Sequence, residues 1–244
     1  MKAWLRNYPS ILLKLMRYYH KMKAKITQQK VFIVVAHPDD AELTMGMRIK
    51  KYLDDNVHIK IVVLSKGGNR GTKIKKIRVR ECLSAGKELG LSPSNYIFGD
   101  FRDTNFSNDR TSIRKFLENV VAGFSPDCLY THFPDDYHLD HIITSEEAVV
   151  ACRSVPTIFY TRSPYSRNFQ PNIFFFDTEV MYNFKHRALQ CFVSQTLIDP
   201  DVIKKFSSVE YLGHLHPNLV KKIYMRFGTK NVFYEPFLLL RKIE

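Results

Sequence analysis

One histidine and two aspartates stand together where an apolar run ends. The run from Val31 to Ala36 is followed at once by His37, Pro38, Asp39 and Asp40. Proline locks its own φ and cannot donate to a sheet ladder, so Pro38 is expected to end a buried strand. An imidazole and two carboxylates at a strand end can bind a metal ion or move protons, and ligands commonly bind at such turns in open α/β sheets. We therefore expect an active site here.

A second set of acids and imidazoles, DDYHLDH, occupies residues 135–141 and also follows an expected strand, 127–132. The C-terminal ends of parallel strands open at one edge of a sheet, so the two sets can meet in space. Either motif alone is more often a solvated loop or a helix cap. Two imidazoles and one carboxylate, however, make a common catalytic zinc set that leaves a position for water. The combined set is His37, His138 and His141 with Asp39, Asp40, Asp136 and Asp140.

Strands and helices alternate around these two motifs. Apolar patterning predicts strands at 31–36, 59–64, 96–98, 127–132, 158–162, 172–177 and 231–241. It predicts helices at 41–53, 72–90, 110–124, 143–154 and 179–195, the fourth of them capped by Thr144 or Ser145. This alternation predicts an α/β fold, with a Rossmann-like, mostly parallel sheet and helices on both faces.

Length and composition indicate one globular domain. The chain has 244 residues with 45% hydrophobic content, and we expect a single domain at 30–244 after a basic N-terminal arm or helix at 1–29. The arm is too short in its apolar centre and too charged to span a bilayer. We expect it to pack on the domain as a helix, to be a loose arm, or to lie on an anionic membrane surface. Four widely spaced cysteines without a CxxC pair predict free thiols and a reducing, cytoplasmic compartment.

The formal net charge of +13 predicts attraction to an acidic partner, which could be nucleic acid, anionic lipid or a negatively charged small substrate. Charge alone does not choose among them.

The two motifs carry a family resemblance. AHPDDAE at 36–42 and HLDH at 138–141 resemble the PIG-L/LmbE-like family of zinc-dependent N-acetylglucosaminyl deacetylases. The similarity covers roughly residues 30–241. Its supporting matches are the RxxE of Arg78 and Glu81, the aspartate Asp103 of FRDTNF, and a later pattern of Asp177, Lys185, Gln195 and YEPF.

The resemblance implies an LmbE-like deacetylase fold and a metal site. In that family pattern His37, Asp40 and His141 would bind one Zn²⁺ per chain, with another divalent metal such as Fe²⁺ as the alternative. One departure is Leu139, where many members have proline, and it bears on the geometry of the second motif.

The same resemblance implies the catalytic roles. Asp39 would be the general base for a metal-activated water that attacks the acetyl carbonyl, releasing acetate and a free amino sugar. His138 would stabilise the oxyanion or protonate the leaving amine, with Asp140 as its orienting partner. Arg78 would hold a phosphate or carboxylate of the substrate, and Asp103 would accept from sugar hydroxyls.

The expected partner is therefore a small-molecule or lipid-linked N-acetyl amino sugar, anionic in keeping with the basic chain. Peripheral membrane contact through residues 1–29 would place the protein at the cytoplasmic membrane surface. We expect no nucleic-acid partner, because clustered acids at strand ends repel phosphates unless a cation neutralises them.

Two other functions stay open. His37, Asp39 and His141 match the HxD...H triad of non-haem iron oxygenases, although such triads usually sit in an all-β jelly roll. The charge of +13 also fits a nucleic-acid or membrane-binding module without catalysis.

Overall fold

The computed structural model describes residues 30–68, 71–214 and 217–242, so the arm predicted at 1–29 lies outside the described residues. In this part of the chain seven strands form one sheet in the order β3-β2-β1-β4-β5-β7-β6. The strands are β1 (Lys30–Val35), β2 (His58–Val63), β3 (Tyr96–Phe98), β4 (Cys128–His132), β5 (Thr157–Thr161), β6 (Ile173–Thr178) and β7 (Val232–Lys242).

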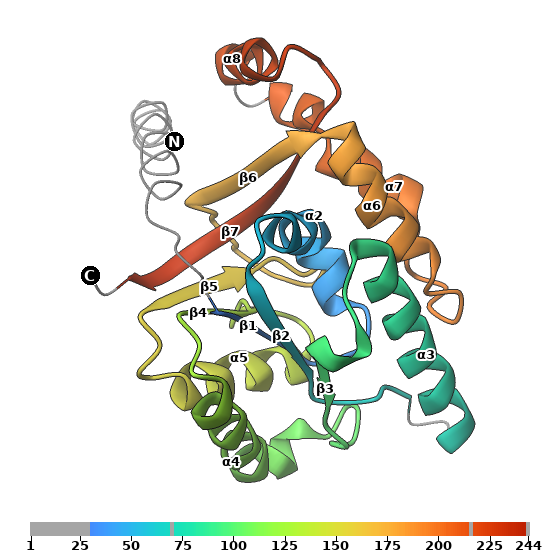
Figure 1. The fold of residues 1–244 in the computed structure, drawn as a ribbon, viewed down its shortest axis with the longest axis vertical. Coiled ribbons are helices and arrows are strands. Elements are labelled where there is room, and N and C mark those ends of the chain that lie inside the picture. Colours follow the sequence, from blue (N-terminus) through green and yellow to red (C-terminus); the bar gives the residue numbers. More distant parts are fainter. Residues whose placement is uncertain (1–29, 69–70, 215–216, 243–244) are drawn as a thin grey trace.

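The first five strands are parallel, whereas β7 pairs antiparallel with both β5 and β6. Helices cover both faces of the sheet (Figure 1). The prediction of an α/β fold with a mostly parallel sheet is therefore confirmed.

The helices on one face are α2 (Asp40–Asp54), α3 (Thr72–Leu89) and α6 (Glu179–Gln190), which contact one another. The other face carries α4 (Phe106–Phe124) and α5 (Leu139–Ala151), which pack together (Figure 1). The remaining helical segments are η2 (Pro93–Asn95), α7 (Pro200–Ser207), η3 (Val209–His214) and α8 (Pro217–Phe227). No helix among the described residues is long and apolar enough to cross a membrane.

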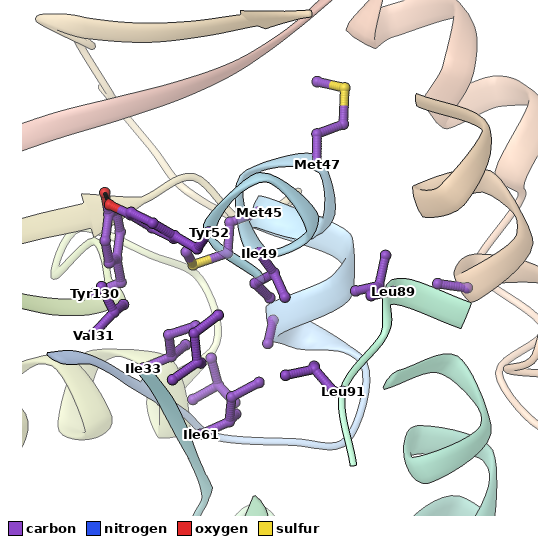
Figure 2. Packing of buried hydrophobic residues seen from close by; sticks show 14 of the residues in the cluster. Val31, Ile33, Met45, Met47, Ile49, Tyr52, Ile61, Leu89, Leu91 and Tyr130 are labelled. Carbon is purple, nitrogen blue, oxygen red and sulfur yellow. Dashed lines mark hydrogen bonds between the residues drawn. The ribbon is translucent and has the colours of Figure 1, made fainter. Parts of the chain in front are cut away.

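The central strand β1 is apolar throughout because both of its faces are covered. Successive side chains of a strand point to opposite faces. Val31 and Ile33 accordingly join the cluster under α2 and α3, and Phe32 and Val34 join the cluster under α4 and α5. Figure 2 shows the first cluster, where Met45 and Ile49 of α2 lie over the strands. This packing holds the start of α2, and with it the first motif, against the end of β1.

Helix α2 is broken near its middle, and a buried acid caps the break. Met45 has non-helical backbone angles of φ −145° and ψ 30°. The amides that begin the second half belong to Met47 and Arg48, and both donate to the Glu235 carboxylate, at 2.9 and 2.8 Å. Lys185 pairs with the same carboxylate at 2.8 Å. A helix start leaves its first N–H groups without intrahelical partners, and Glu235 supplies acceptors for two of them.

Helix α5 begins earlier than its sequence pattern predicts. It starts at Leu139, and its cap is His138, whose side chain accepts from the amide of Asp140. The prediction of a cap at Thr144 or Ser145 is wrong, since both are buried inside the helix. Leu139 is the first helical residue, a position whose N–H has no helical partner and where proline is common. Leucine in place of proline is therefore compatible with the observed turn.

Candidate metal centre

The two motifs meet at the C-terminal edge of the parallel strands. His37 and Asp40 follow β1 directly, while His138 and His141 follow β4, which pairs with β1. His37, Asp40 and His141 are buried, with exposed fractions of 6%, 5% and 3%. The pairing of β1 with β4 thus brings together two motifs that lie far apart in the sequence.

Asp40 lies at the centre of the cluster. Its Oδ2 accepts from the backbone amide of His37 at 2.8 Å and lies 3.6 Å from Nδ1 of the same residue. Its Oδ1 lies 3.5 Å from Nε2 of His141. Ligand atoms also gather within 4.8 Å of one another in three overlapping groups: His37, His138 and His141; Asp40, His132 and His141; His37, Asp103 and Asp140.

Each distance from Asp40 to a histidine is near the edge of a zinc shell. Two ligand atoms at about 2.0–2.1 Å from a tetrahedral zinc lie about 3.3 Å apart. The separations of 3.6 Å from Oδ2 to His37 and 3.5 Å from Oδ1 to His141 are close to that value and long for charged hydrogen bonds, but they involve different oxygens of Asp40, and these three residues together are not one of the groups above. The donor set of two imidazoles and one carboxylate is also one that zinc accepts.

In each of the two candidate imidazole ligands, the ring nitrogen that would not bind the metal lies close to a carboxylate. Nε2 of His37 lies 3.2 Å from Oδ2 of Asp140, and Nδ1 of His141 lies 3.4 Å from Oδ1 of Asp136. Metal-binding histidines usually donate their other ring N–H to such a carboxylate, which fixes the tautomer and the ring orientation.

Asp140 therefore has a different contact from the one we expected. The sequence suggested that its carboxylate orients His138, two residues away. In the structure this carboxylate lies against His37 and accepts from the amides of Thr104 and Phe106, at 2.7 and 3.3 Å. Asp140 reaches His138 through its own backbone amide, which donates to Nδ1 at 3.3 Å. The first turn of α5 aims the two side chains in different directions.

His138 has one ring nitrogen occupied by a backbone hydrogen bond. Because Nδ1 accepts from the Asp140 amide, the ring proton of a neutral His138 sits on Nε2. Burial, together with the positive charge of His37, lowers the pKa of His138. His138 also lines the pocket described below, so it can present an N–H to a bound group.

Asp39 and Arg78 form a pair beside the cluster. Nη2 of Arg78 lies 3.2 Å from Oδ2 of Asp39, and Nη1 lies 3.7 Å from Asp103. The guanidinium packs against Gly67, where an added Cβ would lie 2.5 Å from Nη1. Arg80, two residues further along α3, is exposed.

Asp103, expected to bind sugar hydroxyls, is held by three groups of the protein. It accepts from the amide of Gly68 at 2.8 Å, faces Arg78, and lies 3.3 Å from Nε2 of His37. It lines the pocket together with Arg78. Arg78 and Asp103, the two predicted substrate residues, therefore both lie at the site. Arg78 has two aspartates as partners, and Asp103 has an arginine and a histidine.

The neighbouring carboxylates have opposite pKa shifts. Burial raises the pKa of Asp40, but the charges of His141 and His132 outweigh it and hold the pKa well below its usual value. Burial and the negative charge of Asp40 raise the pKa of Asp39 to about 8, against the opposing charge of Arg78. Two acids whose environments separate their pKa values are suited to different roles.

Two residues of the site were not singled out for a role from the sequence. Asp136, 2% exposed, contacts His141 and accepts from the His138 amide at 2.8 Å. His132, fully buried, accepts from the Ala36 amide at 3.1 Å and stacks on His141 with ring centroids 4.0 Å apart. The amide occupies the Nε2 lone pair of His132, which argues against Nε2 as a ligand atom, whereas the buried Nδ1 has no hydrogen-bond partner among the described residues. The position of His132 at the end of a predicted strand was the available signal.

A pocket of about 670 Å³ opens over the cluster. His37, Asp39, Asp40, His138 and His141 line it, and other parts of its wall come from the segments 162–165 and 195–199 and from α7 and β7. A substrate group can therefore reach the carboxylates and imidazoles from outside.

Sequence comparison finds deacetylases. The family described as PIG-L, GlcNAc-PI de-N-acetylase, matches residues 32–152. An uncharacterized deacetylase of Escherichia coli K12, YaiS, is 28% identical over 166 residues, which cover 66% of this chain and 88% of that protein. A 1D-myo-inositol 2-acetamido-2-deoxy-alpha-D-glucopyranoside deacetylase of Saccharomonospora viridis is 26% identical over 54% of this chain. The match spans 62%, less than two thirds, of that second relative.

Comparison with solved structures shows the same fold. GalB of Pseudomonas putida KT2440, a 4-carboxy-2-hydroxymuconate hydratase, has a TM-score of 0.72 at 18% identity, over 89% of this chain and 98% of its own. The N,N'-diacetylchitobiose deacetylase of Pyrococcus horikoshii has a TM-score of 0.65 at 21% identity, over 87% and 84%. Since a hydratase and a deacetylase share this fold, the reaction has to be argued from the site.

Proposed function

Because the chain belongs to the PIG-L family of deacetylases, we propose that it is a zinc-dependent hydrolase that removes the N-acetyl group from a GlcNAc-type conjugate. The products would be acetate and a free amino sugar. The observation that carries the proposal is the convergence of His37, Asp40 and His141, with Asp40 3.6 and 3.5 Å from the two imidazoles.

These three residues would hold the metal through Nδ1 of His37, the Asp40 carboxylate and Nε2 of His141. Asp140 and Asp136 would act behind the two imidazoles, fixing their ring orientation. The ion, when bound, lowers the pKa of a water to about 7 and polarises a carbonyl oxygen.

Asp39 would act as the general base. Its carboxylate lies next to the proposed ligands and lines the pocket, and Arg78 holds it there through a 3.2 Å contact. It would take a proton from the water as the water oxygen bonds to the carbonyl carbon of the amide, which becomes tetrahedral. The C–N bond would then break as the leaving amine receives a proton. Arg78 thus has a proposed second role, that of orienting the base, beside any contact with substrate.

His138 would donate to the reacting group. Its Nε2–H would stabilise the developing negative charge on the amide oxygen or protonate the leaving amine. Its cap bond to the Asp140 amide fixes the ring with the donor nitrogen free.

The oxygenase alternative fits the geometry less well. It requires Asp39, rather than Asp40, as the carboxylate ligand beside His37 and His141. Asp40 is the acid that faces both imidazoles, whereas Asp39 contacts Arg78. The mostly parallel sheet also differs from the all-β jelly roll in which such triads usually occur.

Acetate release and metal content test the proposal together. Zinc-loaded protein should release acetate from at least one N-acetyl amino-sugar conjugate. Asp39→Asn should retain zinc and lose turnover by about 10²–10⁴-fold, the usual contribution of a general base. His141→Ala should lose the metal.

The opposite results separate the alternatives. Near-normal turnover of Asp39→Asn would show that the base is assigned wrongly. Iron in protein purified without added metal, with no acetate from any N-acetyl sugar, would favour the oxygenase. Salt-dependent DNA binding that survives both substitutions, in a chain without deacetylase activity, would favour the binding module.

A further inference from the structure

Residues 162–168, the loop that follows β5, lie against the loop that carries the second motif. Strands β4 and β5 are parallel neighbours, so both chains leave the sheet at the same edge. An antiparallel bridge then pairs Asp136 with Ser166, and two backbone hydrogen bonds of 3.1 and 2.8 Å join the same two loops. We call residues 162–168 the β5 loop. It belongs to neither of the two motifs, yet it is bonded to one of them.

Asp136 connects the β5 loop to the proposed metal ligand His141. Its Oδ1 accepts from the His138 amide at 2.8 Å and lies 3.4 Å from Nδ1 of His141. Its Oδ2 accepts from the hydroxyls of Ser163 and Ser166, the second at 3.1 Å. One oxygen thus faces the metal centre and the other faces the loop.

The connection is buried. Asp136 and Ser163 are each 2% exposed. A carboxylate away from water needs hydrogen-bond donors from the protein, because an ionised carboxylate can only accept. The two serine hydroxyls supply donors to Oδ2, so the β5 loop determines where this carboxylate lies.

The Ser163 hydroxyl is oriented by its own loop. Its Oγ accepts from the Tyr165 amide at 3.0 Å, and the Ser163 amide donates to Oγ of Ser166 at 3.0 Å. A serine hydroxyl has one proton to donate. With the Tyr165 N–H directed at the oxygen, that proton is left for Asp136. The loop therefore holds the donor in place.

The position of Asp136 matters because Nδ1 of His141 depends on it. This nitrogen is buried and makes no hydrogen bond among the described residues. The Asp136 oxygen at 3.4 Å lies just beyond the usual N–H···O range of about 2.7–3.2 Å. A metal-binding histidine normally donates its second N–H to such a carboxylate, which fixes the ring orientation. A small displacement of Asp136 therefore decides whether this bond forms.

We propose that Ser163 is a positioning residue of the metal centre, which acts through Asp136 on His141, with Ser166 in support. The inference rests on the proposed function in that Nε2 of His141 binds the ion. It extends the site to the β5 loop, which holds Tyr165 in the pocket wall by the same serine.

Zinc affinity of the full chain, measured by competition with a chelating dye, tests the proposal without turnover. Ser163→Ala should weaken zinc binding by about 10-fold, the lower end of the range for residues behind a metal ligand. Asp136→Ala should weaken it by about 10–100-fold, since it removes the carboxylate itself. Parent-like zinc affinity of either variant would overturn the proposal.

The double variant distinguishes positioning from a general loosening of the β5 loop. In the Asp136→Ala background, Ser163→Ala should change zinc affinity by less than about 2-fold, because the hydroxyl no longer has a carboxylate to position. A 10-fold loss in both backgrounds would mean that Ser163 acts by another route, and would overturn the proposal. Ser166→Ala, which removes the second hydroxyl, takes the same place in a second cycle and should give the same pattern.

Ser194→Ala is the matched control. The Ser194 hydroxyl also donates to a carboxylate, that of Glu81, at 2.5 Å, and Ser194 does not line the pocket. This variant should bind zinc like the parent. The visible absorption of the Co²⁺-loaded chain, which reports ligand geometry, should change in Ser163→Ala and in Asp136→Ala but not in Ser194→Ala. Equal effects of Ser194→Ala and Ser163→Ala would overturn the proposal.

Acetate release from N-acetyl amino-sugar conjugates, measured on the same samples, separates this inference from the proposed function. Acetate release by the parent, with unchanged zinc affinity in Ser163→Ala, would overturn the role of Ser163 and leave the deacetylase proposal standing. The expected pattern of zinc affinities without acetate from any conjugate would overturn the deacetylase proposal and support the role of Ser163.

Discussion

Asp39 occupies a strained backbone position. Its φ is 134° and its ψ is −29°, at the cap position of α2, and its side chain makes no capping bond. Residues held in sparsely populated regions cost about 1–3 kcal/mol each and persist where the surroundings impose them. Here the strain brings the carboxylate to Arg78 and into the pocket, so the position of the proposed base is maintained at the expense of stability.

Replacing Asp39 by glycine should destabilise the fold less than replacing it by alanine, and either change should abolish turnover. Glycine adopts positive φ without a steric penalty, so Asp39→Gly should be more stable than Asp39→Ala by about 1 kcal/mol or more. Within ordinary helices the order is reversed, with alanine more stable than glycine. Urea unfolding of both variants, after chelation, measures the difference. An alanine variant as stable as the glycine variant would contradict the presence of strain.

Residue types at the site could be predicted from the sequence, but their contacts only in part. The sequence identified both motifs and the possibility that they meet, because parallel strands end at a common edge. The family resemblance implied that Asp140 orients His138. The structure aims the Asp140 carboxylate at His37 instead, since Asp140 lies in the first turn of a helix. The direction in which the Asp140 side chain points depends on the residue at which α5 begins, and the sequence pattern did not predict that residue correctly.

At the scale of elements, the break in α2 depends on one buried ion pair. The Lys185 and Glu235 side chains are 3% and 1% exposed. Lys185 passes close to the break, since a Cβ built on Gly46 would lie 2.9 Å from its Cγ. The YEPF and Lys185 matches of the sequence thus have a structural role: they join β7 and α6 to the helix that follows the first motif.

Lys185→Met should destabilise the protein by about 3–5 kcal/mol, because it leaves the Glu235 carboxylate buried without its cation. Lys185→Met combined with Glu235→Gln should recover part of that loss, since the buried charge is then absent. Denaturant unfolding of the two single variants and the double variant measures the coupling. Additive losses in the double variant would show that the pair does not act as a unit.

Helices α4 and α5 are joined by a second buried acid. Glu147 of α5 is fully buried and accepts from Nε of Arg110 and of Arg114, both at 2.7 Å. Burial raises the pKa of Glu147, but its hydrogen bonds from Arg114 and Arg110 outweigh that and lower it. A carboxyl whose folded pKa is lowered stabilises the protein above its unfolded pKa, and this contribution is lost as the pH falls through the folded pKa.

Glu147→Gln should therefore destabilise the chain near neutral pH and progressively less in acid. The expected loss at pH 7 is about 1–3 kcal/mol, for charged hydrogen bonds at a buried group. It should shrink as the pH falls below about 4.3, the ordinary glutamate value. Unfolding of chelated protein across this range measures the difference, and Glu146→Gln, at an exposed pair with Arg110, is the control. A difference independent of pH would contradict the ionised state of Glu147.

The last third of the chain was the least predictable at this scale. Helices α7 and α8 each begin with a proline, Pro200 and Pro217. Proline suits the first turn of a helix but also marks loops, and α7 has only eight residues, too few for a clear period. The long helices and buried strands had longer patterns and were predicted. Part of the pocket wall is thus formed by a helix whose apolar pattern was too short to predict it.

At the scale of the whole molecule, the proposed metal would connect two parts of the fold. His37 lies in the turn between β1 and α2, Asp40 is the first residue of α2, and His141 belongs to α5 on the other face of the sheet. An unfolded chain does not hold these three groups together. Zinc should therefore bind the folded state and raise its stability by mass action.

Chelation should lower the Tm of the parent chain. With zinc at 100 times its Kd, the linkage contributes about 2.7 kcal/mol. For a domain of this size 1 kcal/mol shifts Tm by about 2–4 °C, so removal of zinc should lower Tm by about 5–10 °C. Asp39→Asn should show the same shift, because Asp39 is a proposed base and not a ligand. His141→Ala should show little or none. Melting curves with zinc and with chelator give the result, and an equal shift in His141→Ala would mean that zinc stabilises the fold from a different site.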